Sequence, residues 1–201
     1  MMQEAILKNN KIKEERIRLY KSFGYDQEAA RDFIVDKILP VEGKVLEVGT
    51  GKGHTAVLLA KKAGYVISVD ISAEEQQIAK LNAASEDVSH KTGFVVCDAE
   101  KLPYKDRSFD TVVSVNAFHH FKRPFAVLSE MIRVCDKKLA IADFNDEGFR
   151  IIRRVHKSEG HEHQEECGDF SIVGAYLKEH GFIVKKHEGC CQLVYVAERI
   201  K

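Results

Sequence analysis

The chain has 201 residues, which is enough for one α/β domain with a sizeable core. Its 31 lysines and arginines balance 31 aspartates and glutamates, which argues against a protein built around nucleic-acid phosphates. It shows no apolar run near the ~18 residues of a membrane span and no apolar signal-peptide core. The five cysteines are irregularly spaced, as in proteins of a reducing compartment, so we expect a cytoplasmic protein.

Residues 1–40 predict a helical cap. Apolar side chains recur at helical spacing in residues 1–23, and lysines and arginines outnumber acids there. This helix is either a solvated covering helix or a lid over a binding site, with Tyr20 reaching the ligand. A second helix is expected over residues 27–39, because Pro40 disfavours its continuation.

A glycine-rich turn follows the first predicted strand. Val45, Leu46 and Val48 form a short apolar run, as in a strand buried on both faces, and a helical pattern starts at Thr55. Between them lie Gly49, Gly51 and Gly53. A strand, a glycine turn and a helix form the first half of a nucleotide-binding βαβ unit, in which glycine lets the backbone approach a ligand.

The spacing of the turn separates the ligand classes. A phosphate-binding P-loop needs Ser or Thr after its lysine, but Gly53 follows Lys52. A dinucleotide fingerprint needs a third glycine where His54 stands, which disfavours a nicotinamide dehydrogenase. The remaining pattern is E-x-G-x-G-x-G, beginning at Glu47.

Two further strands are each predicted to end in an acid. Residues 65–70 end at Asp70, which lies 21 residues after Gly49, near the spacing expected for a ribose-binding carboxylate. Ser72 supplies the cap of the next helix, which leaves Asp70 available for a ligand. Residues 93–98 end at Asp98, and a fourth strand is expected over residues 108–116.

The chain resembles the class I S-adenosylmethionine-dependent methyltransferases, including those of ubiquinone and menaquinone biosynthesis. The resemblance rests on the glycine turn and on two runs, Asp98-Ala99-x-x-Leu102-Pro103-Tyr104 and Asn116-Ala117-Phe118-His119-His120-Phe121. It implies a doubly wound, Rossmann-like α/β fold with a seven-stranded sheet, an antiparallel last strand and helices on both faces. The expected domains are the cap, residues 1–40, and a methyltransferase domain, residues 41–201, with a substrate-side insertion at about 145–170.

The same resemblance implies the site and the reaction, which is methyl transfer from S-adenosylmethionine to a small-molecule acceptor. Nucleic acid and membrane are not expected as partners, and the oligomeric state stays open. The expected cofactor-binding residues are Glu47, Gly49, Thr50, Gly51, Asp70, Ile71, Asp98, Ala99 and Asn116. Glu47 would order the turn or bind the ammonium group. Asn116 and His119 are the candidate catalytic residues that line the transfer channel.

The segment that contains residues 156–167 leaves alternatives open. His156, His161, His163 and Cys167 could bind zinc or a similar metal, or they belong to a His-rich polar loop. This segment also motivates a second hypothesis, a non-catalytic module that responds to S-adenosylmethionine or to metal. The family usually carries a glycine-containing turn before its fifth strand, whereas residues 135–138 contain no glycine, so we expect a shorter or differently shaped turn there. Cys190 and Cys191 are expected at a strand start.

Overall fold

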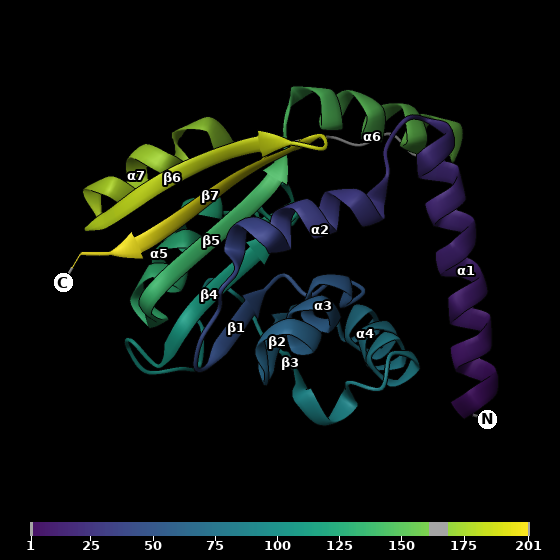
Figure 1. Ribbon diagram of the computed structural model, residues 1–201, viewed down its shortest axis with the longest axis horizontal. Coiled ribbons are helices and arrows are strands. Elements are labelled where there is room, and N and C mark those ends of the chain that lie inside the picture. The colour runs from purple at the N-terminus through teal and green to yellow at the C-terminus, as the bar shows by residue number, and fades with distance from the viewer. Residues whose placement is uncertain (1, 161–168, 201) are drawn as a thin grey trace.

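The computed structural model describes residues 2–160 and 169–200, and its centre is a seven-stranded sheet (Figure 1). The strands are β1 (Val45–Val48), β2 (Val66–Asp70), β3 (Thr92–Val96), β4 (Phe109–Val115), β5 (Cys135–Phe144), β6 (Phe182–Gly189) and β7 (Gln192–Arg199). Their order is β3-β2-β1-β4-β5-β7-β6. Strands β1 to β5 pair in parallel, and β7 is antiparallel to both β5 and β6. The expected Rossmann-like fold with an antiparallel last strand is confirmed.

Helices cover both faces of the sheet (Figure 1). They are α1 (Met2–Ser22), α2 (Gln27–Ile38), α3 (His54–Ala63), α4 (Ala73–Ser85), α5 (Pro124–Val134), α6 (Asp146–Ser158) and α7 (Val173–Glu179). Helices α5 and α7 share one apolar cluster with the sheet, and α2 and α3 share another. Because both faces are covered, all four residues of β1 are buried, including Glu47.

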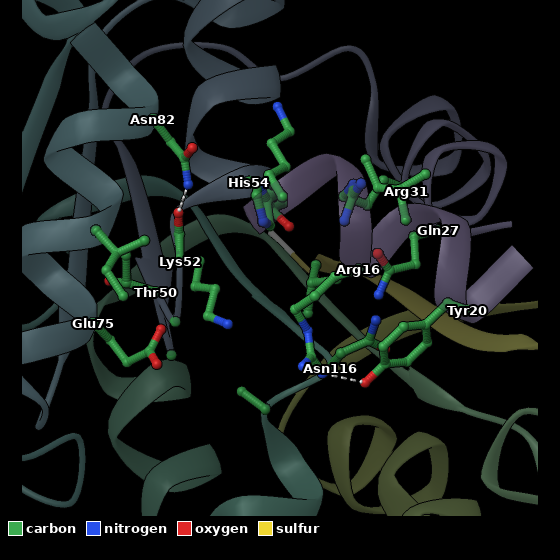
Figure 2. A pocket seen from close by; sticks show the side chains of 18 of the residues that line it. Arg16, Tyr20, Gln27, Arg31, Thr50, Lys52, His54, Glu75, Asn82 and Asn116 are labelled. Atoms are coloured by element: carbon green, nitrogen blue, oxygen red, sulfur yellow. Dashed lines mark hydrogen bonds between the residues drawn. The ribbon is translucent and has the colours of Figure 1, made fainter. Parts of the chain in front are cut away.

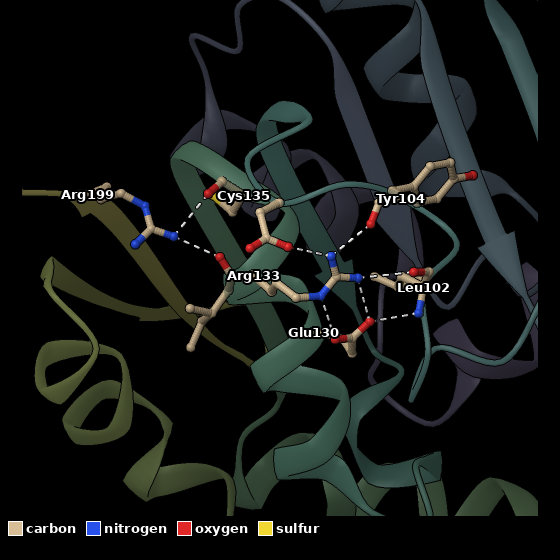
Figure 3. Close-up of polar contacts among 8 residues, drawn as sticks. Leu102, Tyr104, Glu130, Arg133, Cys135 and Arg199 are labelled. Atoms are coloured by element: carbon tan, nitrogen blue, oxygen red, sulfur yellow. Dashed lines mark hydrogen bonds and ion pairs between the residues drawn. The ribbon is translucent and has the colours of Figure 1, made fainter.

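The junction between α5 and β5 is shorter than the family's usual turn, as the absence of glycine there predicts. Helix α5 ends at Val134 and β5 begins at Cys135, so no separate turn forms over residues 135–138. Arg199 stabilises this junction, since its Nη2 donates to the carbonyl oxygens of Ile132 (2.7 Å) and Cys135 (2.9 Å; Figure 3). A side chain of β7 thus satisfies carbonyl groups that the end of a helix leaves without partners.

The expectation that Cys190 and Cys191 begin a strand is wrong, because they form the two-residue turn of the β6–β7 hairpin. Gly189 and Gln192 are directly paired, and the two cysteines between them have φ values of 51° and 62°. Two-residue hairpin turns of this kind need positive φ at both positions, since that backbone twist matches the twist of the strands. The Cys191 carbonyl accepts from the Asn145 amide at 3.1 Å, which ties the hairpin to the start of α6.

Helix α1 is attached to the domain mainly through polar contacts. Its Asn9 Nδ2 donates to Asn82 Oδ1 of α4 at 2.8 Å, and Arg16 Nη1 lies 2.9 Å from Glu159 Oε1 after α6. Tyr20, near its C-terminal end, is its buried side chain. Figure 1 shows α1 standing along one edge of the molecule, beside α4 and beneath α6. None of the described helices combines the length and apolar character needed to cross a membrane.

Candidate functional site

A cavity of about 770 Å³ opens where β1 and β4 end. This is the point where the strand order reverses, and ligands of such sheets bind there. Its volume lies within the range of roughly 300–1,000 Å³ found for small-molecule sites. Helices α1 and α2, the glycine turn, α4 and the segment after β4 supply its walls. Of the predicted residues, the lining includes Gly49, Thr50, Gly51, Asp70, Asn116, His119 and His156.

The glycines of the turn serve different purposes. A Cβ on Gly49 would lie 2.4 Å from Cβ of Ala117, so this position must stay bare for the turn to pack on the segment after β4. A Cβ on Gly51 would meet no atom within 4 Å. Both have positive φ, 85° and 48°, which favours glycine. Gly49 is therefore required for packing, while Gly51 leaves open space for a ligand beside the backbone.

Asp70 connects the glycine turn to the end of β2. Its Oδ2 accepts from the Gly51 amide at 2.8 Å, and its Oδ1 accepts from the Ser72 amide at 2.9 Å. Each carboxylate oxygen can accept a second hydrogen bond, so Asp70 retains acceptor capacity toward the cavity. Ser72 in turn caps α4 by accepting from the Glu75 amide at 3.2 Å, as its sequence pattern predicts.

Glu47 lies beneath the turn and does not line the cavity. Its carboxyl group is 1% exposed and accepts from the Ser68 hydroxyl. The chain of hydrogen bonds continues from Ser68 Oγ to Thr50 Oγ1 (2.6 Å) and then to Gln76 Nε2 (3.0 Å). Burial raises the pKa of the Glu47 carboxyl to about 8, so the group is mostly protonated at neutral pH. Of the two expected roles, this geometry favours ordering the turn.

His119 is held by a buried carboxylate that the sequence analysis missed. Its Nδ1 lies 2.7 Å from Asp143 Oδ1, and its backbone amide donates to Asp143 Oδ2 at 3.0 Å. Asp143 is fully buried at the end of β5 and also accepts from the Phe144 amide at 2.8 Å. The position of Asp143 could have indicated its role. Like Asp70 and Asp98, it is an acid at the end of a predicted strand.

Three further residues expected to bind the cofactor, Ile71, Asp98 and Ala99, lie outside the cavity lining. Ile71 is 74% exposed and Asp98 is also exposed. The Asp98 carboxylate accepts from the Glu100 amide at 2.9 Å, and Ala99 is half-buried. Pairing of β2 with β3 sets Asp70 beside Val96, so this edge continues from the cavity along the ends of the strands. The assignment of Ile71, Asp98 and Ala99 to the cofactor stays a prediction.

Several lining residues could not be identified from their local sequence. Arg31 of α2 (Figure 2), Tyr25 just before that helix and Ile152 of α6 line the cavity, although they are far apart in the chain. His54, where a third glycine was considered, begins α3 and also lines the cavity. Burial, together with the positive charges of Arg31 and two lysines, lowers the pKa of the His54 imidazole to about 3. His54 is therefore neutral at physiological pH.

The predicted metal ligands fall largely outside the described residues. His161, His163 and Cys167 lie in the part that the structure does not describe, and His156 lines the cavity. Within residues 2–160 and 169–200, no group of three or more His, Cys, Asp or Glu side chains could hold a metal ion. The zinc hypothesis stays a prediction.

Comparison with known proteins agrees with the geometry. The family model described as "Methyltransferase domain" matches residues 46–141. Methyltransferase GfsG of Streptomyces halstedii is 36% identical over 103 residues, which cover 50% of this chain and 37% of that protein. Demethylmenaquinone methyltransferase of Thermotoga maritima is 36% identical over 120 residues, covering 58% and 49% respectively. The chain thus matches less than half the length of either relative.

A solved structure supports the fold. The SAM-dependent methyltransferase of Aquifex aeolicus superposes with a TM-score of 0.64 and 23% identity, covering 85% of this chain and 89% of that one. At this identity the likeness concerns the fold alone. The family model, by contrast, matches the segment that contains the glycine turn, Asp70 and the segment after β4. Residues 46–141 therefore match the methyltransferase domain family, and the chain has the fold of S-adenosylmethionine-dependent methyltransferases.

Proposed function

We propose that this protein transfers a methyl group from S-adenosylmethionine to a small-molecule acceptor bound in the cavity between α1, α2 and the glycine turn. The observation that carries the proposal is the joint position of Gly51, Asp70, Asn116 and His119 on one cavity. The first two suit a nucleoside-bearing ligand, and the last two stand at the end of the neighbouring strand. Relatives named as acting on demethylmenaquinone and norajmaline support a small-molecule acceptor.

The described residues fit this cosubstrate. Gly51 leaves space beside the backbone, and Asp70 retains acceptor capacity for hydroxyl groups. The amide oxygen Oδ1 of Asn116 is buried and accepts no hydrogen bond within the described part of the chain. Asn116 also has a φ of 52°, an uncommon value that asparagine tolerates better than most residues. We assign to these residues the binding of the ribose and of the group next to the reacting sulfur.

The chain contributes alignment more than acid–base power. When bound, S-adenosylmethionine supplies a methyl group on a positively charged sulfur, which is already activated for displacement. The walls formed by Tyr20, Tyr25 and Phe144 exclude water and hold the acceptor in line. Aligning two bound reactants lowers a reaction barrier by roughly 7–11 kcal/mol. Most of the rate enhancement is therefore expected from binding geometry.

His119 is proposed as the group that removes a proton from the acceptor. Asp143 lies against Nδ1, so it favours the tautomer with the proton on Nδ1 and leaves Nε2 able to accept another. The carboxylate also stabilises the imidazolium that forms after proton transfer. A positioned base of this kind contributes about 10²- to 10⁴-fold to the rate. Asp143 acts here as a positioning residue.

Calorimetry with S-adenosylhomocysteine, followed by a methyl-transfer screen with isotopically labelled donor, tests the proposal. We expect binding at one site per chain and transfer to at least one small-molecule acceptor. In His119→Gln the rate of transfer should fall, with unchanged affinity for S-adenosylhomocysteine. Absence of binding would refute the proposed function. Binding without transfer to any acceptor would instead support the non-catalytic binding module.

A further inference from the structure

The charges on the cavity wall carry information about the acceptor. Five cationic side chains and two carboxylates line the cavity, so its formal charge is strongly positive. They are Lys8, Lys13, Arg16, Arg31 and Lys52 against Asp70 and Glu75. The protein as a whole is neutral. The excess at the cavity is therefore a local feature that needs its own explanation.

Two of these cations already have partners. Arg16 Nη1 lies 2.9 Å from Glu159 Oε1, and its Nη2 donates to the Tyr20 hydroxyl at 2.9 Å. Lys13 Nζ lies 3.5 Å from Glu86 Oε1. The cations that remain are Lys8, Arg31 and Lys52, and the carboxylates that line the cavity with them are Asp70 and Glu75.

Arg31 is the most informative of the remaining cations. In residues 2–160 and 169–200 its guanidinium makes neither a hydrogen bond nor an ion pair. It is half-buried, and burial lowers its pKa, although an arginine remains charged at physiological pH. Glu28 and Asp32 of the same helix attract it only at longer range. Removing a charge from water without a partner is costly, so Arg31 is placed as if to receive an anion.

Lys52 stands on the other side of the same space. It belongs to the glycine turn, where its backbone carbonyl is held by Asn82 Nδ2 at 2.8 Å. Its ammonium group has no hydrogen bond or ion pair in the described parts of the chain. Figure 2 shows Arg31 on the α2 wall and Lys52 extending from the opposite wall toward the middle of the cavity. His54 lies near both residues. Burial lowers the pKa of its imidazole, and the positive charges of Arg31 and Lys52 contribute to the shift, which agrees with a positive potential at this point.

The cosubstrate alone does not neutralise this potential. S-adenosylmethionine carries one carboxylate, but it also carries an ammonium and a sulfonium group, so it adds net positive charge. A neutral acceptor would leave the charges of Arg31 and Lys52 without a partner in a partly desolvated space, which is unfavourable. An anionic acceptor removes that cost and is attracted to the cavity before it binds.

We propose, building on the proposed methyl transfer, that the acceptor is a small organic anion whose carboxylate or phosphate group binds between Arg31 and Lys52. The guanidinium fork of Arg31 suits either group, because both present two oxygen atoms in a plane. Lys52 adds a point charge from the glycine turn. This placement leaves the reacting atom of the acceptor free to extend toward Asn116 and His119.

Anion binding to protein saturated with S-adenosylhomocysteine tests this assignment. The probes are sodium succinate, sodium phosphate and the neutral analogue succinamide, titrated at constant ionic strength and followed by NMR on the Arg31 side-chain Nε–H. We expect succinate or phosphate to shift this signal and succinamide to leave it unchanged. The anion that binds more tightly distinguishes a carboxylate acceptor from a phosphate acceptor.

Matched variants locate the effect. Calorimetry should show the dissociation constant of the tighter anion rising about ten- to a hundredfold in Arg31→Gln, and rising also in Lys52→Gln. It should be unchanged in Arg18→Gln, an exposed arginine of α1 outside the cavity lining. Equal anion affinity in Arg31→Gln and the wild type would overturn the proposal. So would a loss of S-adenosylhomocysteine binding in Arg31→Gln, because Arg31 would then serve the cosubstrate.

The wild-type controls separate this proposal from the proposed function. If the wild type binds S-adenosylhomocysteine but neither anion, the anionic acceptor is refuted and the methyltransferase proposal stands. If the wild type does not bind S-adenosylhomocysteine, the methyltransferase proposal itself fails. A screen that pairs each candidate carboxylate with its amide gives a second readout, and preferred transfer to the amide would also overturn the inference.

Discussion

Arg133 and Arg31 lie near opposite ends of the parallel strands, and their surroundings differ. Arg133 sits near the starts of β4 and β5, where its Nε and Nη2 each lie 2.7 Å from Glu130. Its Nη1 donates to the Tyr104 carbonyl at 2.7 Å and to Asp106 at 2.9 Å (Figure 3). These partners raise the pKa of its guanidinium, with Glu130 contributing most. Arg31 has no such partner within the described residues.

The comparison distinguishes Arg133, whose charge has a structural role, from Arg31, whose charge is available to a ligand. Arg133 also donates to the Leu102 carbonyl, and Glu130 accepts from the Leu102 amide at 2.8 Å, so the pair holds the loop between β3 and β4 against α5. Arg133 and Glu130 therefore hold the β3–β4 loop in place through the partners that they bind. At the cavity, Arg31 and Lys52 have no charge partner among the described residues. Such charges do not stabilise the protein by itself, and they are typical of binding sites.

The largest expected effect is the loss of cosubstrate binding in Asp70→Ala. The substitution removes the proposed acceptor of the ribose hydroxyls and the partner of the Gly51 and Ser72 amides. We expect no measurable binding of S-adenosylhomocysteine by calorimetry. Asp106→Ala, at the Arg133 edge, should bind with wild-type affinity. Wild-type affinity in Asp70→Ala would refute its assignment.

Gly49→Ala and Gly51→Ala should separate packing from ligand access within one turn. Both place alanine at positive φ, which costs about 1–2 kcal/mol. Gly49→Ala additionally drives a Cβ into Ala117, which adds about 1–3 kcal/mol. Urea denaturation should therefore show Gly49→Ala to be the less stable variant. Gly51→Ala should fold but bind S-adenosylhomocysteine more weakly, and equal stability of the two would contradict the packing argument.

Arg133→Gln should lower the free energy of unfolding by about 2 kcal/mol, because Glu130 and several loop groups lose their partner. Its affinity for S-adenosylhomocysteine should stay within about twofold of the wild type, since the edge it supports is remote from the cavity. Arg31→Gln should show a smaller loss of stability. If urea denaturation finds equal losses in both variants, the contrast between the two arginines does not hold.

Glu47→Gln should change the pH dependence of stability. The folded carboxyl has a pKa of about 8, against 4.5 for the ordinary group, so between these values the folded state binds more protons than the unfolded state. This contribution is full below about pH 4.5 and is lost as the pH rises through about 8. The wild type should lose about 1.4 kcal/mol per pH unit relative to Glu47→Gln within that window.

Urea denaturation at pH 5.5, 6.5 and 7.5 measures this difference. The exposed Glu74 provides the control, and Glu74→Gln should follow the pH dependence of the wild type. Parallel pH profiles of Glu47→Gln and the wild type would show that the carboxyl ionises normally in the folded protein.

Local patterns predicted most of the sheet and much of the turn chemistry. The strand that ends at Asp70, the Ser72 cap and the glycine turn follow from residues close together in the chain. The short α5–β5 junction agrees with the absence of glycine from residues 135–138, but its hydrogen bonds to Arg199, far along the chain, could not be predicted from the local sequence. The hairpin turn at Cys190 and Cys191 was mispredicted because the β6–β7 register imposes positive φ on residues that disfavour it.

The sequence by itself indicated the resemblance to methyltransferases through its motifs. It also determined the order of the elements and the position of Asp70 at the end of β2, because these depend on hydrophobic periodicity and on short spacings. Only the tertiary structure decided that Glu47 lies beneath the turn, that Asp143 holds His119 and that Arg31 faces Lys52 across a cavity. Burial and the presence or absence of a charge partner depend on segments far apart in the chain, so they appear only after the helices have packed on the sheet.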